Sequence, residues 1–244
     1  MKKFLVLTQM NFKRLIFRNL RFFSFDILMP ALFYLIFTKI VNQSVPKEFK
    51  VTYLVSMLIF ATLLSSIITV VNNILDDQEQ HFIRLMDVTS LNPSTYYGSF
   101  FLTILFLTVV EVIAIEIIAY VIVGVQLSLI NWSIITLCVT FGSIILMIFG
   151  SVITFMGDAG MVNLFSSMLV SPLALISGLW FPLTMFPDWL QQIGKTLPTY
   201  QTMDIINQLI NRQKWSLPSL LGELIWLALG IMLMFIVQRK RSKV

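Results

Sequence analysis

Charge, cysteine and histidine are scarce in this 244-residue sequence. Only 12% of its residues are charged, against roughly 25% in a soluble domain, and 57% are hydrophobic, with a mean hydropathy of +0.88. This composition excludes an ordinary soluble domain and predicts an integral membrane protein. The one cysteine, Cys138, lies inside an apolar run, which excludes a disulfide framework and a cysteine-based metal site.

The one histidine, His81, limits the available chemistry in the same way. A single imidazole excludes a zinc-binding histidine pair, and we expect it to be a solvated residue on the short charged helix of the loop at residues 72–98. The run Gly194-Lys195-Thr196 resembles the end of a phosphate-binding loop, but Trp189 occupies the position at which that loop needs glycine. We therefore predict no catalytic residue, metal site or cofactor site on this chain, and an intramembrane enzyme is the weakest functional hypothesis.

Apolar runs in the sequence are long enough for six membrane-spanning helices. A span needs about 20 mostly apolar residues. The predicted spans are residues 22–41, 52–72, 99–124, 133–156, 161–181 and 219–237. The fold class is therefore predicted to be an all-α membrane protein, in which residues 1–244 form a single transmembrane domain.

Basic residues gather at the two ends of the chain. Six of the 17 lysines and arginines lie in the first 21 residues and four in the last six. Because basic flanks favour the cytoplasmic side and anionic lipid, both termini are predicted to be cytoplasmic, and no nucleic-acid partner is indicated. Apolar and basic side chains occupy opposite arcs of residues 1–21. This pattern predicts an interfacial helix, with a basic tail lacking a fixed helix as the alternative.

The longest predicted cytoplasmic loop, residues 72–98, contains an amphipathic segment. Residues 76–87 are polar overall, yet four apolar side chains lie close together there: Phe82, Ile83, Leu85 and Met86. Such a cluster on a short charged helix favours insertion into a groove of a partner protein. The alternative that stays open is a helix lying on the lipid interface.

Residues 171–200 form the most informative stretch. An apolar run ends at residues 178–182, a short amphipathic piece follows, and prolines stand at positions 182, 187 and 198. Irregular backbone at membrane depth is tolerated only where protein or a water-filled cavity covers it. Residues 182–198 are therefore predicted to re-enter the outer side of the membrane and to form the mouth of a transport path. The candidate residues of this mouth are Trp180, Phe181, Pro182, Phe186 and Trp189.

Four acidic residues lie in or beside the predicted spans: Asp26, Glu111, Glu116 and Glu223. A charge in lipid is costly, so such groups are functional candidates. Glu111 and Glu116 lie about 140° apart around a helix, which argues against paired acid–base chemistry. They either face the bundle as structural groups or line a transport path or subunit interface. Asp26 and Glu223 are expected to reach the membrane interface.

Two motif-bearing stretches, together with the order of the predicted elements, carry a family resemblance. The inner stretch reads DDQE (76–79), FIRL (82–85) and TSLNP (89–93), and the outer one reads SGLWFP (177–182), FPDWL (186–190) and LPTY (197–200). With them, the chain resembles the permease subunits of type-2 ATP-binding-cassette (ABC) exporters. It departs from that pattern at His81-Phe82, where members often have Gly-Thr, and at Ser99-Phe100, where they often have lysine.

The resemblance implies partners and a division of labour. The coupling helix would sit in a cleft of a cytoplasmic ATP-binding subunit, which would bind ATP and Mg, and contact it through Asp77, Glu79, Phe82, Ile83, Arg84 and Leu85. A second permease chain, identical or different, would complete the transporter in a bacterial cytoplasmic membrane. The expected function is export of a hydrophobic or amphipathic compound, such as a drug, an antimicrobial peptide or a lipid. The alternative is an autonomous ion-coupled secondary transporter that uses Glu111 and Glu116.

Overall fold

The computed structural model describes residues 2–18, 20–41, 46–80, 93–212 and 214–241, and within these ranges the chain is helical and contains no strand. The principal helices are α1 (Lys2–Arg18), α2 (Leu20–Leu35), α3 (Lys47–Leu64), α4 (Val70–Glu79), α6 (Pro93–Ile118), α7 (Leu129–Ile153), α8 (Ala159–Ile176), α9 (Asp188–Thr196), α10 (Pro198–Arg212) and α11 (Leu217–Arg241). Three π-helical segments, η1 (Ile36–Ile40), η2 (Ser65–Thr69) and η3 (Ala119–Val123), and the short 3-10 helix η4 (Leu183–Met185) complete them.

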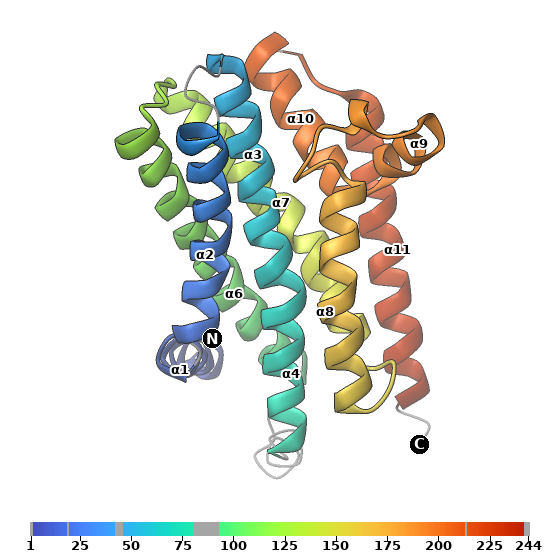
Figure 1. Cartoon of the computed structure of the whole chain (residues 1–244). Helices are drawn as coiled ribbons and strands as arrows, with labels where there is room; N and C mark the ends of the chain where they lie inside the picture. Colours follow the sequence, from blue (N-terminus) through green and yellow to red (C-terminus); the bar gives the residue numbers. More distant parts are fainter. Residues whose placement is uncertain (1, 19, 42–45, 81–92, 213, 242–244) are drawn as a thin grey trace.

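The long helices form a bundle whose two ends differ (Figure 1). Helix α1 lies at the lower left beneath α2, the last turn of α11 also lies at the lower end, and α9 and α10 lie at the upper end (Figure 1). Helix α3 is the most enclosed element, because every residue from Tyr53 to Leu64 is buried. The shared end of the termini agrees with the predicted topology, and which side is cytoplasmic stays a prediction.

Five helices of the described residues are long and apolar enough to cross a membrane. They are Lys47–Glu79, Thr95–Val123, Leu129–Ile153, Ala159–Ile176 and Leu217–Val237. The remaining predicted span, residues 22–41, corresponds to α2, which has 16 residues, contains Pro30 and is continued by η1 to Ile40. The all-helical fold is therefore confirmed, whereas the count of six spans stays a prediction.

The helix that corresponds to the second predicted span, residues 52–72, is much longer than predicted. Helices α3 and α4 join through η2 into one rod of 33 residues, about 50 Å at 1.5 Å per residue, against a hydrocarbon core of about 30 Å. The span was predicted to end at residue 72 because polar residues follow it in the sequence. Asn73 and Asp77 are in fact buried against other helices, so their polarity does not end the helix.

Side-chain caps define the start of α7 and α8. The Ser128 side chain accepts a hydrogen bond from the backbone N–H of Asn131, and the Asp158 carboxylate accepts one from Met161, which satisfies amides that a helix start leaves free. Helix α8 ends at Ile176, before the predicted limit of 181. The chain then turns at Gly178, whose φ of 78° is a left-handed conformation suited to glycine.

Candidate functional site

Three helices meet in a polar cluster at the lower end of the bundle, which we call the inner node: Asn11, Arg14, Asp77, Tyr96 and Ser99. The Arg14 guanidinium donates two hydrogen bonds to the Asp77 carboxylate, at 2.5 and 2.7 Å, and the Tyr96 hydroxyl donates another. Asn11 donates to the Ser99 hydroxyl at 3.0 Å. A two-pronged guanidinium–carboxylate pair fixes orientation as well as distance, so the node holds α1, α4 and α6 in register.

The node stands next to the predicted docking loop. Helix α4 ends at Glu79, which is exposed, while Phe82, Ile83, Arg84 and Leu85 lie outside the described residues. Asp77 is only 2% exposed, and its carboxylate is engaged within the chain. Asp77 therefore anchors the inner end of α4, and its contact with a partner subunit stays a prediction.

Two of the acidic residues accept hydrogen bonds inside the protein. Asp26 and Glu223 are both buried within the protein, and their position relative to the membrane interface stays a prediction. Thr69 donates to Asp26 at 2.8 Å, and Thr202 donates to Glu223 at 2.5 Å. Each carboxylate turns inward because a hydroxyl of a neighbouring helix offers it a hydrogen bond.

Glu111 and Glu116 face different surroundings, although both belong to α6. Glu116 accepts a hydrogen bond from Thr136 of α7, at 3.0 and 3.2 Å from its two oxygens. Glu111 is 0% exposed, and neither of its oxygens has a hydrogen-bond partner among the described residues. The two acids therefore form no paired site, and their part in transport stays a prediction.

The outer stretch folds into a helical pair that is longer than the predicted segment 182–198. Helix α9 packs against the end of α8, where Gly194 approaches the carbonyl oxygen of Ile176, and α10 continues to Arg212 against α3, α7 and α11. Ser177 and Thr199 share a hydrogen bond of 2.5 Å that joins the two ends of the turn. Re-entry of this pair into the outer side of the membrane stays a prediction.

The predicted mouth residues do not share one environment. Trp180 packs against Phe60 and Phe33, with ring centroids 5.4 and 6.0 Å away, and thus ties the turn to α2 and α3. Phe181 and Trp189 are exposed, and so is Pro182, while Phe186 is half-buried. Trp180 therefore serves as the inner anchor of the segment, and the exposed aromatic side chains form its outer surface.

A polar cluster that the sequence analysis missed fastens α10 to α11. The Asp204 carboxylate accepts hydrogen bonds from Ser216 and Ser219, both at 2.6 Å, and from Gln208 at 3.1 Å. Burial, together with the nearby Asp204 charge, raises the pKa of the Tyr200 phenol. Turn residues such as Ser216 have no periodic pattern, so no local signal could have identified the cluster.

Comparison with known proteins agrees with this architecture. The sequence model of the family described as ABC-2 type transporter matches residues 2–210. A protein of Bacillus subtilis (strain 168), named "Putative transport permease YvfS", is 26% identical over 231 residues, which cover 94% of each chain. The family match spans most of the chain, from α1 to α10. The chain therefore belongs to the ABC-2 type transporter family.

Proposed function

We propose that this chain is the membrane-spanning permease of an ATP-driven exporter in a bacterial cytoplasmic membrane, with both termini in the cytoplasm. A separate ATPase subunit would bind ATP and Mg and dock on residues 76–87. The observation that carries this proposal is the rod of α3, η2 and α4, whose inner end is held by the inner node immediately before the docking loop.

The rod offers a path for mechanical coupling. Closure of two ATPase subunits around ATP would push on each docking loop, and the force would enter α4 beside Asp77. Because Asp77 is bound to α1 and α6, these helices would move with α4. The outer half of the rod, α3, packs against α8 and α10, so displacement can reach the outer helical pair.

A polar stripe on α8 favours a second permease chain. Asn163, Ser167 and Ser171 follow one another at four-residue spacing and are all exposed. Polar groups in a membrane span normally face a helix partner or a water-filled cavity, because lipid offers them no hydrogen bonds. The stripe is therefore suited to face a second copy or the transport path between two chains.

The exposed faces of the spans favour an apolar or amphipathic cargo. Helix α11 exposes a mainly apolar surface, and α8 adds exposed Leu164, Phe165 and Met168 beside its polar stripe. A path bordered by such faces has few fixed polar groups with which to bind a strongly hydrophilic solute. We expect a drug, an antimicrobial peptide or a lipid to be carried outward.

The docking loop provides the direct test of the proposed function. Changing Phe82→Asp together with Leu85→Asp should abolish co-purification of a stoichiometric ATPase subunit from native membranes, because two charges would enter an apolar groove. Mass spectrometry of the tagged complex measures the loss. The matched control is Leu129→Asp, an exposed residue at the predicted outer end of α7, which should retain the ATPase.

Two outcomes would contradict this prediction. Retention of the ATPase in the double variant would place docking elsewhere on the chain. Purification of the unaltered protein alone, under several mild detergents, would favour the ion-coupled transporter instead. Transport driven by an ion gradient without ATP, and lost in Glu111→Gln or Glu116→Gln, would then establish that alternative.

Crosslinking tests whether α8 faces a second permease chain. Because Cys138 is the one cysteine, a Cys138→Ala background allows single cysteines to be placed at will. Ser167→Cys or Ser171→Cys should give an oxidised adduct with twice the mass of the chain in native membranes. Ile225→Cys, which lies on the exposed face of α11, should stay monomeric. Adduct formation by the α11 variant alone would mean that α11, and not α8, faces the second permease chain. An adduct whose mass differs from twice that of the chain would indicate a heterodimer.

A further inference from the structure

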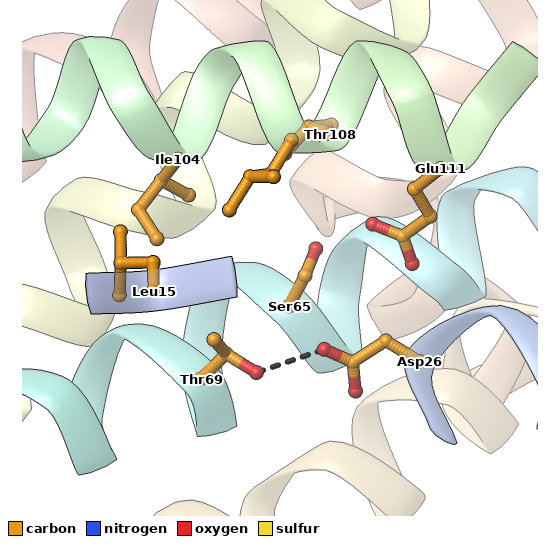
Figure 2. Close-up of a pocket in the computed structure, with 8 residues that line it drawn as sticks. Leu15, Asp26, Ser65, Thr69, Ile104, Thr108 and Glu111 are labelled. Carbon is orange, nitrogen blue, oxygen red and sulfur yellow. Dashed lines mark hydrogen bonds between the residues drawn. The ribbon is translucent and has the colours of Figure 1, made fainter. Parts of the chain in front are cut away.

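A small cavity lies between α1, α2, η2 and α6, about 20 Å³ in volume (Figure 2). A volume of about 10–15 Å³ is enough for one water molecule, so the cavity has room for a single one. Its polar wall consists of two carboxylates and three hydroxyls: Asp26, Glu111, Ser65, Thr69 and Thr108. Leu15, Ile104 and Leu107 form the apolar remainder.

The hydrogen bonds around the cavity are incomplete. Within the part of the chain that the structure describes, both oxygens of Glu111 and the hydroxyl of Thr108 have no hydrogen-bond partner, although all three atoms are buried. Ser65 lies beside Glu111 but donates its hydrogen to the carbonyl oxygen of Thr62, at 3.3 Å. Unpaired buried polar atoms are costly, so these groups call for a ligand that both donates and accepts hydrogen bonds.

The backbone is irregular at the same place. Ser65 and Thr69 are the first and last residues of η2, a π-helical segment within the rod, and π-helical turns inside α-helices frequently mark functional sites. Thr69 donates to Asp26, which draws α2 to this segment (Figure 2). The π-helical turn therefore brings the hydroxyls of Ser65 and Thr69 to the wall of the same cavity.

The charges of the cavity also need compensation. Asp26 and Glu111 are close enough to repel one another when both are ionised, and the described residues of the wall include no lysine, arginine or histidine. Two like charges in a buried site favour retention of a proton by one of them. Thr69 donates to the Asp26 carboxylate at 2.8 Å, whereas neither Glu111 oxygen accepts a hydrogen bond from the described residues, although the Ser65 hydroxyl lies beside it.

We infer that this cavity is a binding site for one water molecule and one proton, with the proton on Glu111. Protonated Glu111 donates to the water, which accepts from Thr108 as well and donates to the ionised Asp26. The assembly then carries one negative charge instead of two, and it joins α2 to α6 through the water. The site is a property of this chain alone and does not depend on the proposed ATPase partner.

Infrared spectroscopy of the full-length protein in lipid nanodiscs tests the site. The carbonyl stretch of a protonated carboxylic acid should be present at neutral pH, and Glu111→Gln should remove that component in a difference spectrum. Asp26→Asn should keep the component but move its frequency, because the acceptor beyond the water has changed. Glu48→Gln, at an exposed carboxyl near the start of α3, should leave the spectrum in this region unaltered.

The same preparations give the outcomes that would overturn the inference. Identical carboxylic-acid bands in the unaltered protein and in Glu111→Gln would show that Glu111 carries no proton. A melting temperature that rises in sodium chloride relative to N-methylglucamine chloride, but not in Glu111→Gln, would show a sodium ion in its place. If Glu111→Gln yields no folded protein, the Asp26→Asn spectrum decides alone, since an unmoved band excludes the bridge.

Discussion

Replacing Arg14 with methionine should destabilise the protein by about 3 kcal/mol, the lower end of the range for removal of one partner of a buried ion pair. The change leaves the Asp77 carboxylate, which is 2% exposed, without its guanidinium, and the neutral Tyr96 hydroxyl cannot compensate its charge. We take the lower end because Arg14 is 20% exposed and solvent already screens part of the interaction. The melting temperature in detergent, followed by size-exclusion chromatography after heating, measures the effect.

Two matched variants separate the charge from the packing at the inner node. Asp77→Asn should cost less than Arg14→Met, because the partly exposed guanidinium can turn to solvent. The double variant should recover part of the loss, since no unpaired carboxylate remains. Equal losses of stability in the two single variants, with no recovery in the double variant, would mean that the pair stabilises the protein by side-chain packing rather than by electrostatic attraction. A further consequence of the proposed coupling is that Arg14→Met should lower cargo-stimulated ATPase activity.

Gly150→Ala should also destabilise the protein, although it adds a single methyl group. A Cβ at Gly150 of α7 would lie 2.4 Å from the backbone carbonyl oxygen of Ser66 in η2. Backbone cannot turn aside as a side chain does, so α7 and the rod must separate. We expect a loss of about 1–3 kcal/mol, the usual cost of overpacking, and a fall in the yield of folded protein from membranes. The melting temperature and the monodisperse fraction measure it.

Gly98→Ala is the control for this prediction. A Cβ at Gly98 of α6 would lie 3.6 Å from the Phe4 ring, an ordinary contact. Alanine favours a helix by roughly 1 kcal/mol over glycine, so this variant should be neutral or more stable. Similar behaviour of Gly98→Ala and Gly150→Ala would contradict the close approach of α7 and η2. The comparison also tests the π-helical segment on which the water site depends.

The spans were the most predictable part of the molecule. The runs at residues 133–156 and 219–237 correspond closely to α7 and α11, because hydrophobic length is a local property that the bilayer demands of each helix. The interruption after residue 176 was likewise visible as clustered prolines and Gly178. Errors arose where polar residues are covered by protein: the rod continues to Glu79 because Asp77 meets Arg14, which lies 63 residues earlier.

The candidate sites were less predictable, for a related reason. The position of Asp26 near the start of its span gave no indication that its side chain would be buried and would accept a hydrogen bond from Thr69 of another helical segment. Trp180 was assigned to the outer mouth, yet Phe60 and Phe33 enclose one side of its ring. Nothing in the local sequence around these residues indicates which partner a distant helix will offer.

Composition and hydrophobic length were thus sufficient for the membrane location, the helical fold and the basic ends of the chain, because each residue type meets the bilayer independently of its neighbours. Tertiary packing decided the inner node, the burial of the acidic residues and the cavity between Asp26 and Glu111. These features consist of hydrogen bonds and close contacts between helices. Their geometry depends on which helices pack together in the folded protein, so local hydrophobicity and residue spacing cannot predict it.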